Sequence, residues 1–176
     1  MLFRSVPGVA APIAGRILST PVDRAPRLND VTLRAGRPLS ADRPDDVWLL
    51  EPFARAHRLR PGDRLGATIA GRRHAFVIAG LVLSPEYVYA VRPGEIMADN
   101  RAFGVLWMAR RPLAVAAELD GAFNDVAVTL SRGANERDVL DRLDRVLAPY
   151  GGTGAIPRRQ DRKSTRLNSS HSQQSR

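Results

Sequence analysis

Apolar and polar residues alternate in several short stretches of the chain, which is the pattern of strands with one buried face. Six such stretches are predicted to be strands: residues 15–20, 31–34, 46–50, 65–69, 75–83 and 102–108. The fourth and fifth form a hairpin around the turn "AGRRH", and the apolar run "AFVIAGLVL" predicts that its return strand is buried on both faces. A seventh strand is expected at 124–131, where Val126, Val128 and Leu130 share one face.

Three segments carry helical signals. Residues 51–59 predict a short helix with Pro52 in its first turn, and the sequence "RPGD" after it predicts a type II turn with Gly62 at the third position. A second short helix is expected to begin near Pro112. Residues 133–152 predict an amphipathic helix with Asn135 as its N-cap and Gly151 at its end. Its apolar stripe consists of Val139, Leu140, Leu143, Val146 and Leu147.

This order of elements predicts one α+β domain, a mixed or antiparallel sheet with short helices on it. The length of 176 residues fits one domain with appendages, and the apolar content of 44% is ordinary for a globular protein. The longest apolar run has nine residues, whereas a membrane helix needs about 20. There are no cysteines, so disulfides and thiolate metal sites are excluded.

The net charge of +9 invites a nucleic-acid interpretation, but the type of basic residue argues against it. Of the 27 basic residues, 26 are arginine, a bias that GC-rich coding sequences produce without any binding surface. Six arginines lie between Arg55 and Arg73, interrupted by Asp63 and by turn residues. That pattern favours a solvated rim, and no nucleic-acid partner is expected.

Both ends of the chain differ from the rest. Residues 161–171, "DRKSTRLNSSH", back-translate into a string that resembles a common sequencing-library adapter, and they include Lys163, the chain's only lysine. Residues 1–5, "MLFRS", fit the reverse complement of the same adapter. We therefore expect residues 1–5 and 161–176 to be adapter-derived, with the second segment disordered, and residues 6–160 to be a partial natural domain of net charge about +5. A natural basic tail is the alternative, and the source nucleotide sequence decides between them.

Candidate chemistry is sparse. His57 is expected on the surface of a short helix and His74 beside a hairpin turn, with no further ligand near either one. Asp63 and Glu95 follow Pro-Gly pairs, and turn geometry accounts for both. The chain has no nucleophile elbow, no zinc-protease motif and no phosphate-binding glycine loop. The sequence therefore predicts no catalytic residue, no metal and no cofactor.

The stretch "SPEYVYA" is the best candidate for contact with a substrate or partner. Pro85 breaks the preceding strand, Glu86 adds a charge, and Tyr87 and Tyr89 fall on one face of an extended segment. Tyrosine is favoured at interfaces because it combines apolar area with a hydroxyl group. The alternative is that both tyrosines only cover the core.

The order of these features resembles a known family. The passage 45–95, with its strand "DVWLL", the helix after it, "LRPGDRL" and "IAGLVLSPEYVYA", is similar to the extracytoplasmic, MacB-type periplasmic domain of FtsX-like ABC transporter permeases. "FGVLWM" (103–108) and "AFNDVAVTL" (122–130) extend the similarity, which covers nearly all of residues 6–160. Each motif alone is weak, and the specificity lies in their order.

The resemblance implies a MacB-like fold and a non-enzymatic role. Such a domain lies on the extracytoplasmic side of the inner (plasma) membrane and belongs to a permease whose membrane bundle docks on a separate ATPase subunit. Its expected partners are that subunit, that bundle, and a lipid, lipoprotein or peptide substrate. The absence of a membrane helix departs from the family pattern and fits a truncated piece. A soluble α+β binding module with no transport role is the competing hypothesis.

Overall fold

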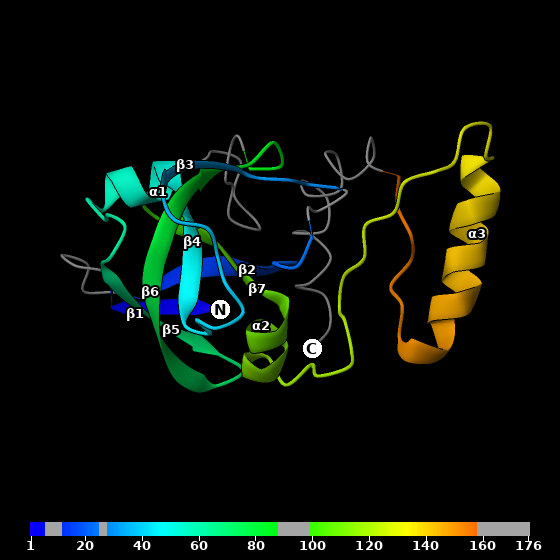
Figure 1. Ribbon diagram of the computed structural model, residues 1–176. Coiled ribbons are helices and arrows are strands. Elements are labelled where there is room, and N and C mark those ends of the chain that lie inside the picture. Colours follow the sequence, from blue (N-terminus) through cyan, green and yellow to red (C-terminus); the bar gives the residue numbers. More distant parts are fainter. Residues whose placement is uncertain (6–11, 25–27, 88–98, 158–176) are drawn as a thin grey trace. The chain divides into compact units, whose positions relative to one another are not determined.

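The structure is a computed structural model that describes residues 1–5, 12–24, 28–87 and 99–157. The chain divides into two compact units (Figure 1). The described residues up to Val126 form the first, here called the barrel unit, and those from Ala127 onward form the second, the helical unit. None of the described helices is long and apolar enough to cross a bilayer.

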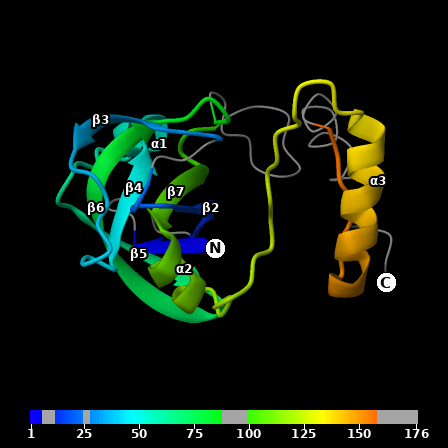
Figure 2. The same ribbon diagram turned by 45° about the vertical axis from the view of Figure 1, so that its right-hand side comes forward.

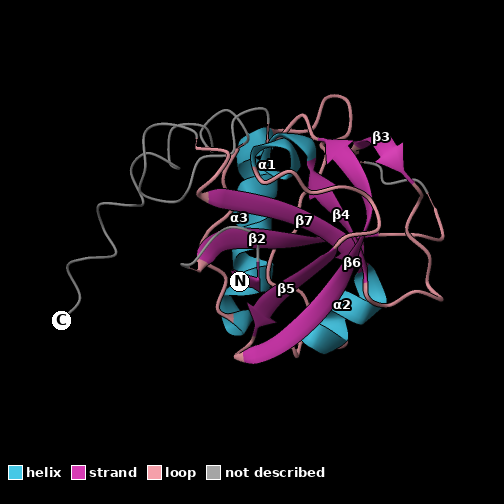
Figure 3. Cartoon of the chain, turned by 90° about the vertical axis from the view of Figure 1, so that its left-hand side faces the viewer, coloured by secondary structure: helices cyan, strands magenta, loops and turns pink. Residues whose placement is uncertain are grey.

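Seven strands make up the sheet of the barrel unit. They are β1 (Leu2–Ser5), β2 (Ile13–Thr20), β3 (Thr32–Gly36), β4 (Asp46–Leu50), β5 (Arg64–Ile69), β6 (Arg72–Leu83) and β7 (Phe103–Ala109). The order β3-β6-β4-β7-β2-β1-β5 is completed by a further pairing between β5 and β6. Six strands therefore close into a barrel, and β3 extends the sheet beside β6. Figure 3 shows β2, β4, β5, β6 and β7 of this sheet. The pairs β2–β7 and β4–β6 are parallel and the others antiparallel, so the predicted α+β class and mixed sheet are confirmed.

The barrel interior holds the main core. Alternate residues of each strand point inward, as period-2 geometry requires. Those of β4, β5 and β6 include Val47, Leu49, Leu65, Phe76 and Ile78, all at most 1% exposed. A second cluster, made of Leu50, Val82, Phe103, Val105 and Trp107, comes from the intervening positions of the same sheet. Every residue of β7 is buried because both of its faces are covered.

Two short helices close the ends of the barrel. α1 (Glu51–Ala56) continues from β4, and α2 (Arg110–Ala116) continues from β7. Because β4 and β7 are antiparallel, these helices leave the sheet at opposite ends (Figures 1 and 2). Phe53 of α1 and Leu113 of α2 both belong to the core cluster.

The first helix is shorter than predicted. It ends at Ala56 rather than near Leu59, because Arg58 adopts a left-handed backbone with φ +57°. The amide of Leu59 then donates to the carbonyl of Ala54 at 2.9 Å, which returns the buried Leu59 to the core. The turn after it has Gly62 at φ +95° and a bond from Asp63 N to Arg60 O of 3.1 Å, as the sequence predicts.

The β5–β6 hairpin turns more tightly than expected. Its turn contains only Ala70 and Gly71, with φ values of +46° and +78°, the signs of a type I′ turn. Residues 72–74, predicted as part of the turn, are the first residues of β6. His74 is therefore a strand residue and not a turn residue.

Residues 1–5, expected to be adapter-derived, form strand β1 between β2 and β5. Phe3 is 1% exposed, and its ring stacks on that of Phe53 with centroids 5.2 Å apart. This sequence thus fills the gap that would otherwise open the barrel. The adapter origin of residues 1–5 stays a prediction, which only the source nucleotide sequence can test. The second adapter-like segment, residues 161–176, lies outside the described residues.

The helical unit contains α3 (Glu136–Leu147) and the short 3-10 helix η1 (Ala148–Tyr150). The Asn135 side chain accepts a bond from Arg137 N at 3.0 Å, and Gly151 ends the helical segment with φ +78°. The N-cap was predicted correctly, but α3 itself ends at Leu147, and Gly151 ends η1 instead. No residue of α3 is buried.

The seventh predicted strand, at 124–131, is wrong. The described backbone there forms no strand, and Val126, Val128 and Leu130 are 50%, 50% and 41% exposed. A strand needs a hydrogen-bonding neighbour, and among the described residues none pairs with this segment. Alternation of apolar and polar residues shows that a segment is suited to a strand with one buried face. It does not provide the neighbouring strand that must pair with it.

Candidate contact site

The candidate contact residues follow the end of β6. Ser84 is buried, and its hydroxyl accepts a hydrogen bond from the Glu86 amide at 3.2 Å. Its carbonyl accepts a second bond from the Tyr87 amide at 3.3 Å. These bonds hold the chain in a tight bend, which places Pro85 and Glu86 on the surface.

Tyr87 packs against the second apolar cluster. Its ring meets Trp107 of β7 edge to face, with centroids 5.8 Å apart and an interplanar angle of 79°. Trp107 is 4% exposed, whereas Tyr87 is half-buried. Tyr87 therefore covers the core and also has part of its surface exposed to solvent.

The structure brings together Pro85, Glu86 and Tyr87 in one bend. Tyr89, the fourth predicted contact residue, lies outside the described residues, as does Glu95. The site consists of the exposed proline ring of Pro85 and the carboxylate of Glu86, beside the partly exposed Tyr87. Such a surface can bind a partner.

The rings of both histidines pack against phenylalanine rings of the barrel unit. The Nε2 atom of His57 lies 3.0 Å from the carbonyl of Arg101, and its ring lies 4.4 Å from that of Phe53. His74 stacks on Phe76 with centroids 5.9 Å apart, and its Nε2 atom is buried without a hydrogen-bond partner among the described residues. His57 follows the end of α1 and His74 lies in β6, and no described cluster of three metal-ligating residues includes either one.

Asp63 has the turn role that its sequence predicted. Its carboxylate accepts a hydrogen bond from Arg60 N at 2.7 Å, and its carbonyl accepts one from Ile78 N at 2.9 Å. These bonds fasten the loop before β5 to β6. The carboxylate therefore fixes a turn at the barrel wall.

An ion pair that the sequence analysis missed joins Arg37 to Asp46. Two guanidinium nitrogens of Arg37 meet the two carboxylate oxygens of Asp46, which is 4% exposed at the start of β4. This hydrogen bond raises the pKa of Arg37, against the opposing effect of desolvation. Trp48 Nε1 also donates to the Arg37 carbonyl at 3.0 Å. The signal in the sequence was Asp46 itself, an acidic residue that opens an otherwise apolar strand.

No family model, curated protein or solved structure matches this chain.

Proposed function

We propose that this chain is a piece of the extracytoplasmic domain of an FtsX-like ABC transporter permease of the inner (plasma) membrane. In this proposal the domain contacts a lipid, lipoprotein or peptide substrate, or a partner, and couples that contact to ATP hydrolysis by a separate ATPase subunit. The domain itself performs no catalysis. The MacB-like identity of its fold belongs to the same proposal.

The order of the family-like motifs carries the proposal. "DVWLL" forms β4, the next segment forms α1, "LRPGDRL" leads into β5, and "FGVLWM" lies within β7. These four motifs follow one another along the chain and form β4, α1, β5 and β7 of one barrel. Their spacing is therefore set by the same fold. The last motif, at 122–130, continues beyond the barrel into the helical unit.

The reading frame on both sides of this segment in the source genome tests the proposal. We expect an apolar run of about 20 residues upstream and several downstream, each able to span a bilayer. A neighbouring gene should encode an ATPase with a phosphate-binding loop. Flanking sequence without any such apolar run would contradict the proposal and favour the soluble binding module.

The contact site has a separate test in the full-length transporter. The double change Tyr87→Ala and Tyr89→Ala should abolish or strongly reduce transport at normal expression. Tyr87→Phe with Tyr89→Phe is the matched control, because it keeps the ring that packs on Trp107 and removes only the hydroxyls. Undiminished transport by the alanine variant would show that these residues only cover the core.

A further inference from the structure

The charges of the barrel unit are unevenly distributed. Residues 51–75, from α1 through the start of β6, carry six arginines against the two carboxylates of Glu51 and Asp63. The other described residues between Pro12 and Val126 carry eight arginines against ten carboxylates. Positive charge is therefore concentrated in α1, the loop after it and the β5–β6 hairpin, whereas the other described residues of the unit, with Arg4 and the N-terminal amine included, are close to neutral in net charge. We call Arg55, Arg58, Arg60, Arg64 and Arg73 the arginine surface; Arg72 lies opposite the inward-facing Ile69 and is not part of it.

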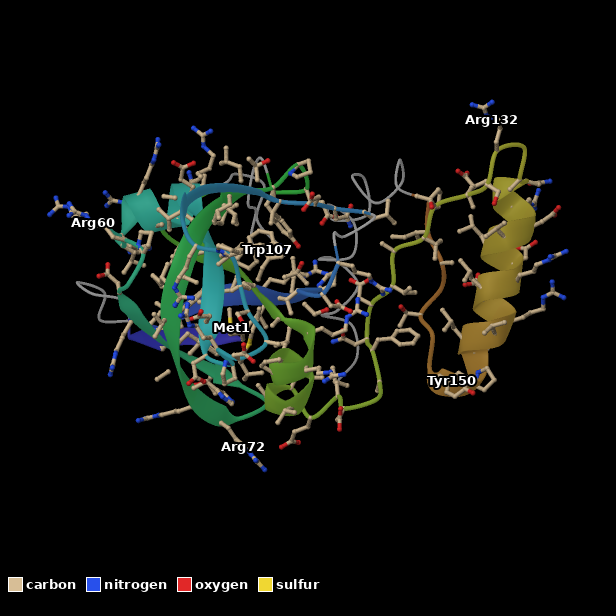
Figure 4. All side chains as sticks on the ribbon, in the orientation of Figure 1. Met1, Arg60, Arg72, Trp107, Arg132 and Tyr150 are labelled. Atoms are coloured by element: carbon tan, nitrogen blue, oxygen red, sulfur yellow. The ribbon has the colours of Figure 1, made fainter. Side chains whose placement is uncertain are left out.

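Most of this charge is unneutralised. Arg55 pairs with Glu51 at 2.7 Å, and Arg72 pairs with Glu118 at 3.1 Å. Among the described residues, no carboxylate forms an ion pair with the other four arginines, all of which are exposed. Figure 4 shows Arg60 pointing away from the barrel near α1.

The β5–β6 hairpin gives the surface a defined geometry. Leu65, Ala67 and Ile69 point into the core, so Arg64, Gly66 and Thr68 face outward. On β6, Arg73 lies opposite Thr68, and the exposed Ala75 lies opposite Gly66. Arg64 and Arg73 therefore stand about 14 Å apart along the hairpin, from the strand rise per residue. Between these two arginines the outer face of the hairpin consists of the small residues Gly66, Thr68 and Ala75.

We infer that the arginine surface lies against the anionic headgroups of a phospholipid bilayer. This surface lies on the outside of a closed barrel, and its arginines extend outward over small residues, so a planar array of phosphates can meet several of them together. This inference stands on the charge distribution and goes beyond the proposed transport role.

A nucleic-acid partner fits this surface less well. Residues 51–75 contain no tyrosine or tryptophan, and their one phenylalanine, Phe53, is fully buried. Single-stranded nucleic acid therefore finds no stacking platform here. β1 pairs with residues 66–68 of β5 and β4 with residues 77–82 of β6, so most of the hairpin belongs to the barrel and only its end, around the Ala70–Gly71 turn, extends beyond these neighbours.

Vesicle co-sedimentation of the full chain tests the inference. The chain should bind vesicles of equal parts phosphatidylglycerol and phosphatidylcholine at low salt, and it should not bind vesicles of phosphatidylcholine alone. Binding should disappear at about 1 M salt, where the Debye length is about 3 Å. The double variant Arg64→Gln, Arg73→Gln should bind about 25-fold more weakly, since each surface arginine contributes about a factor of five.

The variant Arg110→Gln, Arg111→Gln is the matched control. These two exposed arginines follow β7, the strand opposite β5 in the ring, and their loss changes the net charge equally. It should retain most of the binding. Equal losses in the two variants, or no binding by the wild type, would overturn the inference. Salt-sensitive binding to duplex DNA without vesicle binding would also overturn it, in favour of nucleic acid.

Discussion

Phe53 in the barrel unit has no exposed surface, whereas the helical unit has no buried residue in its main helix. The barrel closes because six strands pair in a ring and their inward residues form one core. The helix α3 has a well-formed N-cap and an apolar stripe, but Val146 of that stripe is 64% exposed. The barrel unit is therefore stabilised by tertiary packing, and the helix of the helical unit by local interactions such as its N-cap.

This difference teaches how far local sequence signals determine structure. The N-cap and helical periodicity suffice to specify where α3 begins, although a helix of this length is marginal in isolation. The alternating segment 124–131 carries an equally clear local signal and forms no strand, because hydrogen bonds between strands are not local. Helical patterns can be satisfied by the segment alone, but strand patterns cannot.

Truncation of the barrel core should have the largest effect. Phe53→Ala removes a buried ring that contacts Phe3 and should lower the free energy of unfolding by about 3–5 kcal/mol. Urea denaturation followed by tryptophan fluorescence measures this change, because Trp48 and Trp107 are the only tryptophans and both lie in the barrel unit. Leu143→Ala on α3 is the control and should leave that transition unchanged. A similar loss from both variants would break the distinction between the two units.

A pair of glycines sharpens the description of the barrel. Gly36 and Gly62 have almost the same φ, +91° and +95°, but a Cβ on Gly36 would lie 2.2 Å from the carbonyl oxygen of Ala79, and one on Gly62 would meet nothing within 4 Å. Gly62→Ala should therefore cost about 1–2 kcal/mol of backbone strain. Gly36→Ala should cost at least about 1 kcal/mol more in the same urea experiment. Equal costs would show that β3 does not pack on β6 as described.

The smallest effect is expected at the cap of α3. Asn135→Ala removes the acceptor for the Arg137 amide and should destabilise the helix by about 1 kcal/mol. Amide hydrogen exchange of α3 measures this, and tryptophan fluorescence of the barrel should not respond. Asn135→Asp keeps the acceptor and should behave like the wild type. Unchanged exchange in the alanine variant would mean that packing, not the cap, holds the helix.

Much of the fold was predictable from the sequence. The strand 46–50 was placed at its correct residues because turn residues precede it and a proline-containing helix follows it. The closure of the barrel was not predictable, because the β2–β7 and β4–β6 pairs join residues far apart in the sequence. The pairing of Arg37 with Asp46 was missed for a related reason, since it depends on β3 and β4 both lying beside β6.

The candidate site was predictable only in part. The proline break and the exposed Glu86 follow from the local sequence. The contact between Tyr87 and Trp107 depends on how two distant segments meet, so no local pattern could reveal it. Six arginines between Arg55 and Arg73 were visible in the sequence, but the outward orientation of Arg64 and Arg73, and the opposite orientation of Arg72, needed the strand register.

The proposed extracytoplasmic position can be tested directly because the chain contains no cysteine. In the full-length gene product, Ala41→Cys would place a thiol in an exposed turn, and Leu49→Cys would place one in the core as a control. A membrane-impermeant maleimide should label the first variant on intact spheroplasts, leaving the second variant unlabelled until denaturation. Labelling of Ala41→Cys only after the membrane is permeabilised would place the domain on the cytoplasmic side and contradict the proposed function.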